Sequence, residues 1–308
     1  MLSNYFLRHV SACCRVTTQH MLYHSRAHPK PIPEFAVTDA LSSLLKDVNA
    51  RKRLRSRRLK RRGVETAPDH PDETIELAVN LNLDPRKPGQ ALRGSISLPN
   101  GTGKKQMDCL VFTSDPAIQE AALQAGAKYA GGESLADEIV AGRVAVDTIQ
   151  RSLATAEIVP VISKKVARLL GPRGLMPNAK EGTLLQGSAE LLEALETQLA
   201  GKQVPYRTEK EGIVHVPVGR GSFGKTKLLE NIGQVMKTIF DVKPENYGKG
   251  KKKKTTGKGT KYLLRASVSS TQGKGVRLDL RTVDPNSTFF LTSPEEVAKA
   301  ALASETHA

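Results

Sequence analysis

The chain has 308 residues and a formal net charge of +16, with 47 Lys and Arg against 31 Asp and Glu. That length has room for about two domains and tails. Cys13, Cys14 and Cys109 show no C-x-x-C spacing, which excludes a disulfide framework and a cysteine zinc site. No apolar run approaches the roughly 20 residues that a membrane span needs.

The positive charge is concentrated in the two ends of the chain. Residues 1–67 hold 14 cations against 4 acidic residues, and residues 201–308 hold 20 against 10, whereas residues 68–200 hold 13 against 17. This asymmetry indicates a nucleic acid that contacts only part of the molecule. The alternative is a basic surface that only keeps the protein soluble.

The first 33 residues contain no acidic residue, while Arg8, Arg15 and Arg26 recur among Ser, Thr, Leu and Tyr. Such a start is typical of a mitochondrial presequence, and the short apolar run at residues 10–14, with Arg on both sides, argues against a secretory signal. We therefore expect residues 1–33 to be a mitochondrial targeting presequence. A merely disordered tail is the alternative.

Residues 34–67 are predicted to form an amphipathic helix followed by a basic arm. The helix runs from Phe35 to Ala50, with Thr38 placed to cap it. Residues 51–62 then hold nine cations in twelve positions, a density that repels itself unless an anion neutralises it. The run is interpreted as a phosphate-contacting arm that gives affinity rather than sequence choice, because it lacks aromatic side chains. Its cations are Arg51, Lys52, Arg53, Arg55, Arg57, Arg58, Lys60, Arg61 and Arg62.

Strand patterns follow. Ile75, Leu77, Val79 and Leu81 alternate as in a half-buried strand, and residues 93–99 form a second strand before a glycine hinge at 100–103. From residue 107 a buried strand at 109–112 and helices at 117–125, 135–140 and 188–200 predict a parallel sheet covered by helices. No G-x-G-x-x-G follows the first of these strands, so no dinucleotide site is expected.

Beyond Gly201 the pattern predicts a hairpin of residues 204–207 and 213–218 around a turn at 209–212. A helix at 226–240 and closing strands at 262–269 and 276–280 follow. The Lys- and Gly-rich insert at 248–261 is expected to be disordered, and the tail from residue 282 is expected to be a peripheral extension.

One motif is typical of nucleotide-binding enzymes. Residues 219–226 match the phosphate-binding pattern G-x-x-x-x-G-K-[ST], which would place Lys225 on the terminal phosphates of a nucleotide. The preceding strand fits a hairpin rather than a parallel sheet, and fewer than 90 residues remain for the rest of such a sheet. His215 has no partner at metal-ligand spacing. We therefore expect no catalytic residues, no metal and no cofactor.

The most specific signal for a protein family is the Gly- and Pro-rich stretch at residues 171–178. It ends a helical pattern, and Gly171 is expected to be the left-handed cap of that helix. With Lys180 and Gly182 behind it, it resembles the signature of the large-subunit ribosomal protein family of the mobile L-one stalk. Asn80-Leu81, Asp84-Pro85-Arg86, Gln90, Arg93-Gly94 and Leu98-Pro99 resemble that family in the same order. The signature residues are Gly171, Pro172, Arg173, Gly174, Leu175, Met176, Pro177 and Asn178.

The resemblance covers about residues 34–281 and implies an α/β protein of two domains. Residues 68–101 and 201–281 would form a split α+β RNA-binding domain. Residues 102–200 would form an inserted Rossmann-like three-layer α/β domain, and 282–308 a C-terminal extension. The charges agree, because residues 102–200 hold 10 cations and 12 acidic residues while the flanking parts are basic.

The resemblance also implies an RNA-binding site on the split domain. Pro71 stands where the family usually has Phe, and Gln272 where it usually has Met, and both changes remove apolar contact surface. Thr271 and Gly273 are expected to approach RNA closely, Gly273 with a positive φ. The site residues carried over are His70, Pro71, Thr74, Glu209, Lys210, Ser270, Thr271, Gln272 and Gly273.

The implied function is that of a structural constituent of the large subunit of the mitochondrial ribosome, in the mitochondrial matrix. The expected partners are large-subunit rRNA, other mitochondrial ribosomal proteins and tRNA in transit, with no small-molecule substrate. A free RNA-binding translational regulator would share every residue above, and a P-loop nucleotide-binding enzyme is the third reading. Copurification with ribosomes separates the first two, and nucleotide binding that is lost in Lys225→Ala would support the third.

Overall fold

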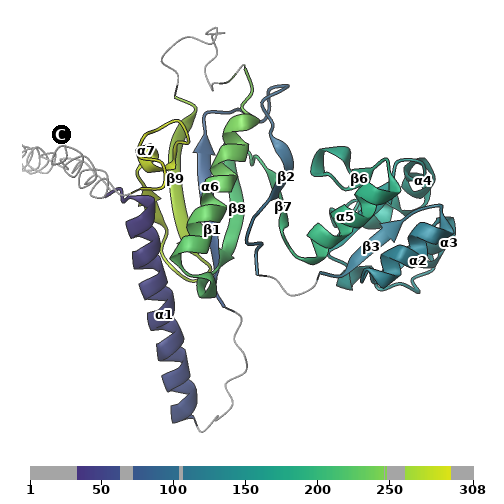
Figure 1. The fold of residues 1–308 in the computed structure, drawn as a ribbon, viewed down its shortest axis with the longest axis horizontal. Coiled ribbons are helices and arrows are strands. Elements are labelled where there is room, and N and C mark those ends of the chain that lie inside the picture. Colours follow the sequence, from purple (N-terminus) through teal and green to yellow (C-terminus); the bar gives the residue numbers. More distant parts are fainter. Residues whose placement is uncertain (1–32, 63–71, 104–106, 246, 248–260, 293–308) are drawn as a thin grey trace, which may run out of the picture. The chain divides into compact units, whose positions relative to one another are not determined.

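A computed structural model describes residues 33–62, 72–103, 107–245, 247 and 261–292 of this α/β protein (Figure 1). The expected presequence, His70 and Pro71 of the candidate site, most of the Lys-rich insert and the tail beyond residue 292 lie outside these residues.

The first sheet has four antiparallel strands in the order β10–β9–β1–β8. They are β1 (Thr74–Leu81), β8 (Ile213–Arg220), β9 (Leu263–Ser270) and β10 (Val276–Leu278). Ile75, Leu77, Val79 and Leu81 are fully buried while Glu76 is exposed, as the alternation predicts. One face of this sheet therefore carries the main core, and the other meets solvent.

Two helices cover the buried face, α1 (Val37–Arg61) and α6 (Lys225–Asp241) (Figure 1). α6 buries residues at helical spacing, among them Leu228, Ile232 and Val235. The first turns of α1 contribute Val37, Leu41, Leu44 and Val48 to the same core. A short pair, β2 (Arg93–Ser97) with β7 (Gln203–Arg207), adds further buried residues.

Helix α1 is longer than its sequence pattern predicts. The expected end at Ala50 is wrong, because the helix continues through the basic run to Arg61. Cations in the last turns of a helix are favoured by its macrodipole, and acidic side chains neutralise some of them, as described below. The expected cap is also wrong. Ala36 occupies the N-cap position, and Thr38 is a buried helical residue.

The expected hairpin of residues 204–207 and 213–218 is wrong in its pairing, although both strands exist. β7 pairs with β2, and β8 pairs with β1. Only an isolated bridge between Thr208 and Val214 joins the two segments. Neighbouring strands in the chain thus divide between two sheets, a choice that local pattern does not specify.

Residues 107–199 form a parallel sheet in the order β4–β3–β5–β6. Its strands are β3 (Cys109–Phe112), β4 (Tyr129–Gly131), β5 (Arg151–Thr155) and β6 (Leu184–Leu185). The helices are α2 (Pro116–Gln124), α3 (Glu133–Val140), α4 (Val159–Leu170) and α5 (Ser188–Leu199), with 3-10 turns η1 (Val146–Thr148) and η2 (Ala179–Glu181). Two separate hydrophobic clusters line this sheet, one with α3 and α4 and the other with α2 and α5, so it is covered on both faces as parallel sheets are.

The signature stretch, residues 171–178, joins α4 to η2. Gly171 has a φ of −58° and is right-handed, so its expected left-handed cap role is wrong, whereas Gly174 has a φ of +69°. Position 171 still favours glycine, because a Cβ added there would lie 2.6 Å from the carbonyl oxygen of Ala167. Ser152 donates a hydrogen bond to the backbone oxygen of Leu175, which ties the loop to β5.

The first part of the C-terminal extension is not peripheral. Helix α7 (Leu280–Val283) places Val283 in the main core, and the hydroxyl of Thr282 accepts a bond from the backbone amide of Val37 at 3.4 Å. The start of α1 is thereby joined to α7.

Candidate nucleic-acid interface

The first strand of the antiparallel sheet begins where the last long strand ends, and the backbone of Thr74 meets Thr271 there. The Thr271 amide donates to the Thr74 oxygen at 3.0 Å. The Thr271 hydroxyl accepts from the Thr74 amide at 3.1 Å and donates back to the Thr74 oxygen at 3.2 Å. This hydroxyl therefore holds the loop of residues 271–275 on β1, and its bonding capacity is largely used within the chain.

A buried carboxylate lies directly beside this junction. The Glu73 side chain is only 6% exposed. Arg51 donates from Nε and Nη2 to its two oxygens at 3.0 and 2.7 Å, and Arg55 donates from Nη2 to Oε1 at 3.0 Å. Both arginines come from α1, so one carboxylate holds two successive turns of that helix. We call this group of three side chains the Glu73 clamp.

The clamp has a clear electrostatic signature. Hydrogen bonds from Arg51, the largest influence, and from Arg55 and Ser270 outweigh burial and lower the pKa of Glu73 from 4.5 to about 2. The same contact raises the pKa of Arg51. Glu73 is therefore ionised at every physiological pH, and the positive charges of the two arginines are partly compensated inside the protein.

The clamp also reaches the loop. Arg51 Nη2 donates to Ser270 Oγ at 2.8 Å, and Arg55 donates to the side-chain oxygen of Gln272. An added Cβ at Gly273 would lie 2.3 Å from Ser270 Oγ and 2.9 Å from Arg51 Nη2. Gly273 is thus small because the clamp packs on it, and the expected positive φ is wrong, since Gly273 is not among the left-handed glycines of the described residues.

A second acidic residue strengthens the attachment of α1. Asp72 lies 3.2 Å from Lys52 Nζ, and a hydrogen bond from Ser222 together with this ion pair lowers the pKa of Asp72. The Gly221 amide, in η3 (Gly221–Phe223), donates to the backbone oxygen of Glu73 at 3.0 Å. Residues 72 and 73 therefore join α1, β1 and η3 at one end of the sheet.

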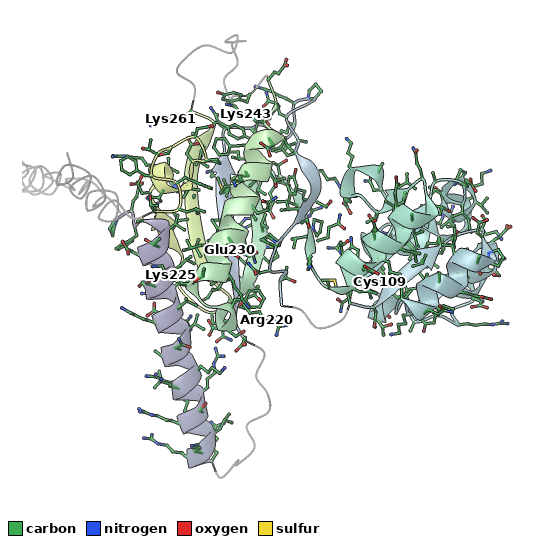
Figure 2. All side chains as sticks on the ribbon, viewed as in Figure 1. Cys109, Arg220, Lys225, Glu230, Lys243 and Lys261 are labelled. Carbon is green, nitrogen blue, oxygen red and sulfur yellow. The ribbon has the colours of Figure 1, made fainter. Side chains whose placement is uncertain are left out.

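The structure does not bring all candidate site residues together. Thr74 and Ser270, Thr271, Gln272 and Gly273 share the end just described. Glu209 and Lys210 lie at the opposite end, since Asn80 pairs with Ile213 there while Thr74 pairs with Arg220. The eight residues of β1 are separated by seven steps of about 3.3 Å, which puts its two ends roughly 23 Å apart. Figure 2 shows the same division, with Arg220 and Lys225 at one end and Lys243 and Lys261 at the other.

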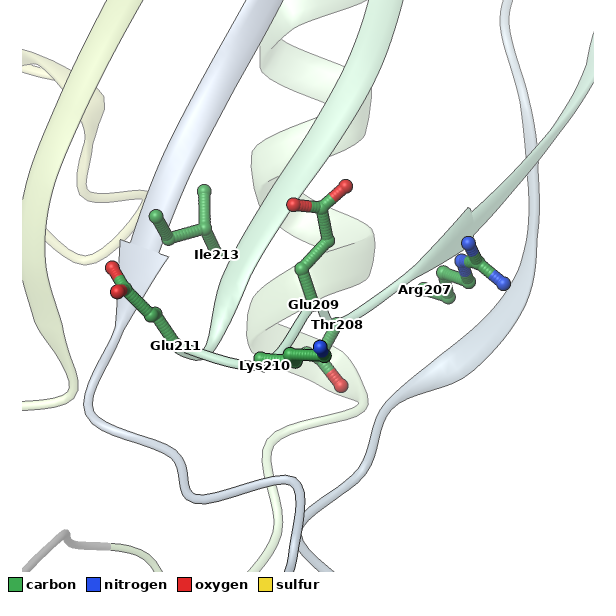
Figure 3. Close-up of a pocket in the computed structure, with 6 residues that line it drawn as sticks. All are labelled: Arg207, Thr208, Glu209, Lys210, Glu211 and Ile213. Carbon is green, nitrogen blue, oxygen red and sulfur yellow. The ribbon is translucent and has the colours of Figure 1, made fainter.

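Glu209 and Lys210 belong to an open cavity of about 540 Å³ (Figure 3). Two cations and two acidic residues lie on its wall, so it offers no net attraction to a polyanion. Its lining residues are Arg207, Thr208, Glu209, Lys210, Glu211 and Ile213.

The predicted basic arm divides into two sets. Arg51, Lys52 and Arg55 have acidic partners within the chain. The other six cations are exposed and have no ion pair with another described residue. Sequence reasoning missed Asp72 and Glu73. The available signal was an acidic pair directly before the first strand and after a cationic helix, which could neutralise part of that helix.

The nucleotide-binding pattern at residues 219–226 lies at the end of the sheet where β1 begins, because Thr74 pairs with Arg220 there. Its strand, β8, is antiparallel to β1, unlike the parallel strand that precedes a phosphate-binding loop.

Within the described residues no group of acidic, His or Cys side chains could hold a metal ion, and no helix there could cross a membrane. Burial raises the pKa of Cys109 to about 11, so this thiol is not a nucleophile at neutral pH.

Comparison with known proteins shows the family. The model of the "Ribosomal protein L1p/L10e family" matches residues 64–274. The chain belongs to this family. The "Large ribosomal subunit protein uL1" of Syntrophobacter fumaroxidans is 41% identical over 208 residues, which cover 68% of this chain and 80% of the relative. Those of Laribacter hongkongensis and Neisseria meningitidis are 42% and 41% identical over 212 and 213 residues, each 69% of this chain and 82% and 83% of the relative.

The family match includes the sheet end but not the helix attached to it. Glu73, Thr74 and the loop to Lys274 lie within residues 64–274, whereas all of α1 precedes them. The L1 part of the chain therefore supplies the acidic side of the clamp, and the segment before it supplies the arginines.

Proposed function

We propose that this chain is a structural protein of the large ribosomal subunit that binds large-subunit rRNA and has no catalytic role. Its membership of the ribosomal L1 family carries this proposal, because the match includes the candidate sheet end. In this proposal, residues 68–101 and 201–281 are the split RNA-binding domain, and 102–200 are the inserted domain.

The RNA contacts are assigned first to the sheet end of Thr74 and residues 270–273. Thr271 and Gln272 are exposed there, and Lys274 follows without an ion pair to a described residue. Because the Thr271 hydroxyl and the Gln272 side-chain oxygen are used within the chain, recognition falls to the Gln272 amide nitrogen, Lys274 and the exposed backbone, which suit sugar and phosphate groups. His70 and Pro71 stay in the proposed site, next to Asp72 in sequence.

A matched pair of variants tests this assignment. Lys274→Glu and Lys210→Glu make the same charge change at opposite ends of the sheet. Filter binding of the full chain to the stalk segment of large-subunit rRNA should show a loss of tenfold or more for Lys274→Glu and less than threefold for Lys210→Glu. Equal losses would show that one RNA spans both ends and that Glu209 and Lys210 belong to the site.

The ribosome is proposed to be the mitochondrial one, with the chain in the matrix. The acid-free leader supports this, although the relatives named above are bacterial. A fusion of residues 1–40 to a reporter should enter mitochondria, and cytosolic retention would leave the ribosomal proposal standing without the mitochondrial one. Cosedimentation of the tagged chain with mitochondrial large subunits tests both, and recovery only with free RNA would favour the translational regulator. Other mitochondrial ribosomal proteins and tRNA in transit are the further proposed partners.

A further inference from the structure

The cations of α1 lie on distinct faces of the helix. At about 100° per residue, Arg55, Arg58 and Arg62 lie within about 40° of Arg51 around the helix axis. Arg53 lies about 160° away from Arg51 and Arg57 about 120° away in the same direction, so these two arginines share the opposite side of the helix. The face that the Glu73 clamp holds therefore continues, one and two turns later, as Arg58 and Arg62.

This face extends beyond the body of the protein. Arg55 contacts Glu73 and Gln272 at the sheet end, and the helix continues to Arg61. Six further residues at 1.5 Å each carry it roughly 9 Å past that contact. Figure 1 shows the last turns of α1 running past the end of the sheet. The projecting part of α1 and the loop of residues 271–275 thus meet at an angle at this end of the sheet, and we call the surface between them the corner.

We propose that this corner is a binding surface for the RNA sugar–phosphate backbone, with Arg58 and Arg62 on the helix side and Gln272 and Lys274 on the loop side. All four side chains are exposed, and neither arginine has an ion pair with another residue that the structure describes. This inference rests on the proposed function and deepens it. Arg53 and Arg57 face away and contribute only to the general positive potential.

Glu73 is the positioning residue of this surface. It lies buried and does not meet RNA, but it fixes two turns of α1 against the loop. A helix held before binding loses little conformational entropy when it meets its ligand, so its exposed arginines bind more strongly than those of a free tail. The loop is held at the same time, through Ser270 and Gln272.

Two matched double variants test the orientation of the arm. Arg58→Ala with Arg62→Ala removes two exposed arginines from the corner, and Arg53→Ala with Arg57→Ala removes two from the opposite side. Each is compared with the wild-type full chain by filter binding to the stalk rRNA segment across a KCl series. A scrambled RNA of equal length serves as the reference.

We expect the corner pair to weaken stalk RNA binding tenfold or more and to reduce the slope of log K against log salt by about 1.4–1.8, since each phosphate contact contributes roughly 0.7–0.9. The opposite pair should weaken binding less than threefold. Equal losses of affinity for the two double variants would refute the proposed binding surface at the corner, because the arm would then act only as diffuse positive charge. No loss for either pair would also overturn it and assign the arm to a partner other than RNA. A wild-type chain that does not prefer the stalk RNA would instead overturn the proposed function.

Adding Glu73→Gln to both double variants tests the positioning role. Without the clamp the arm loses its fixed orientation, so the difference between the two pairs should shrink to less than twofold. A difference that persists in folded protein would show that Glu73 does not orient the arm. If Glu73→Gln does not fold, Arg55→Gln removes one half of the clamp while leaving the acidic residue paired with Arg51, and should reduce the difference in part.

Discussion

Replacing Glu73 by Gln should destabilise the protein in a manner that depends on pH. The substitution keeps the size of the side chain and removes its charge, which leaves Arg51 and Arg55 without their acidic partner. The pKa falls from 4.5 to about 2 on folding, a shift of about 2.5 units that corresponds to roughly 3 kcal/mol at 1.36 kcal/mol per unit. Breaking a buried ion pair by removing one partner gives a similar figure, about 3–5 kcal/mol.

The sign of the pH dependence follows from the lowered pKa. Stabilisation by Glu73 is complete above the unfolded pKa of 4.5 and is lost as the pH falls through the folded value of about 2. The free energy of unfolding of the wild type should therefore exceed that of Glu73→Gln by about 3 kcal/mol at pH 7 and by only about 1 kcal/mol at pH 3.

Urea unfolding at a series of pH values measures this difference, with circular dichroism as the probe. Glu76→Gln is the control, because Glu76 is an exposed residue of the same strand and loses the same charge. Glu76→Gln should lie within about 0.5 kcal/mol of the wild type. A Glu73→Gln difference below 1 kcal/mol at pH 7, or one that does not change between pH 7 and pH 3, would refute the argument from the clamp.

Three further substitutions test other parts of the fold by the same urea assay. Gly212→Ala should destabilise the protein by more than 2 kcal/mol, because Gly212 has a φ of +75° and an added Cβ would lie 2.5 Å from a backbone oxygen. Gly89→Ala is the control: Gly89 has a φ of +79° but nothing lies within 4 Å of an added Cβ, so the substitution should cost only about 1 kcal/mol. Equal effects of the two substitutions would contradict the steric argument. Asn231→Leu should destabilise by about 2–4 kcal/mol, because its buried amide bonds three backbone groups, at 2.6, 3.1 and 3.2 Å; a change below 1 kcal/mol would show that these groups find other partners. Thr271→Val should destabilise by about 1–2 kcal/mol through its lost bonds to Thr74, and lowered affinity for the stalk RNA without any loss of stability would show that the hydroxyl serves the RNA instead.

Much of the local structure could be predicted from the sequence. Alternating apolar residues at 75–81 predict β1, and helical spacing predicts α5 and α6 to within one or two residues. Gly126 and Gly201 stand just after the C-caps of α2 and α5, where left-handed glycines commonly end helices, with φ values of +106° and +64°. These features depend on residues that are neighbours in the chain, so a short window of sequence contains the information that they require.

The sequence by itself also determined the kind of protein. The stretch from Gly171 to Asn178 and the motifs between residues 80 and 99 resemble the L1 family, and the family match confirms that resemblance. Part of the candidate site followed from it, because Thr74 and residues 270–273 do meet in space. The separation of Glu209 and Lys210 from them by the length of a strand did not follow, since the resemblance names positions but not the strand ends at which they lie.

Only the tertiary structure decided which cations of α1 remain available for a ligand. Arg51 lies 22 residues before Glu73 and 219 before Ser270, and no local pattern reports such contacts. The helix extends past Ala50 because carboxylates from a distant segment neutralise its inner face. Pairing of β7 with β2, and of β8 with β1, likewise depends on which strands meet when the chain folds. Sequence periodicity sets the elements because it is local, whereas strand pairing and buried ion pairs join residues far apart in the chain, and only the folded structure shows which of them meet.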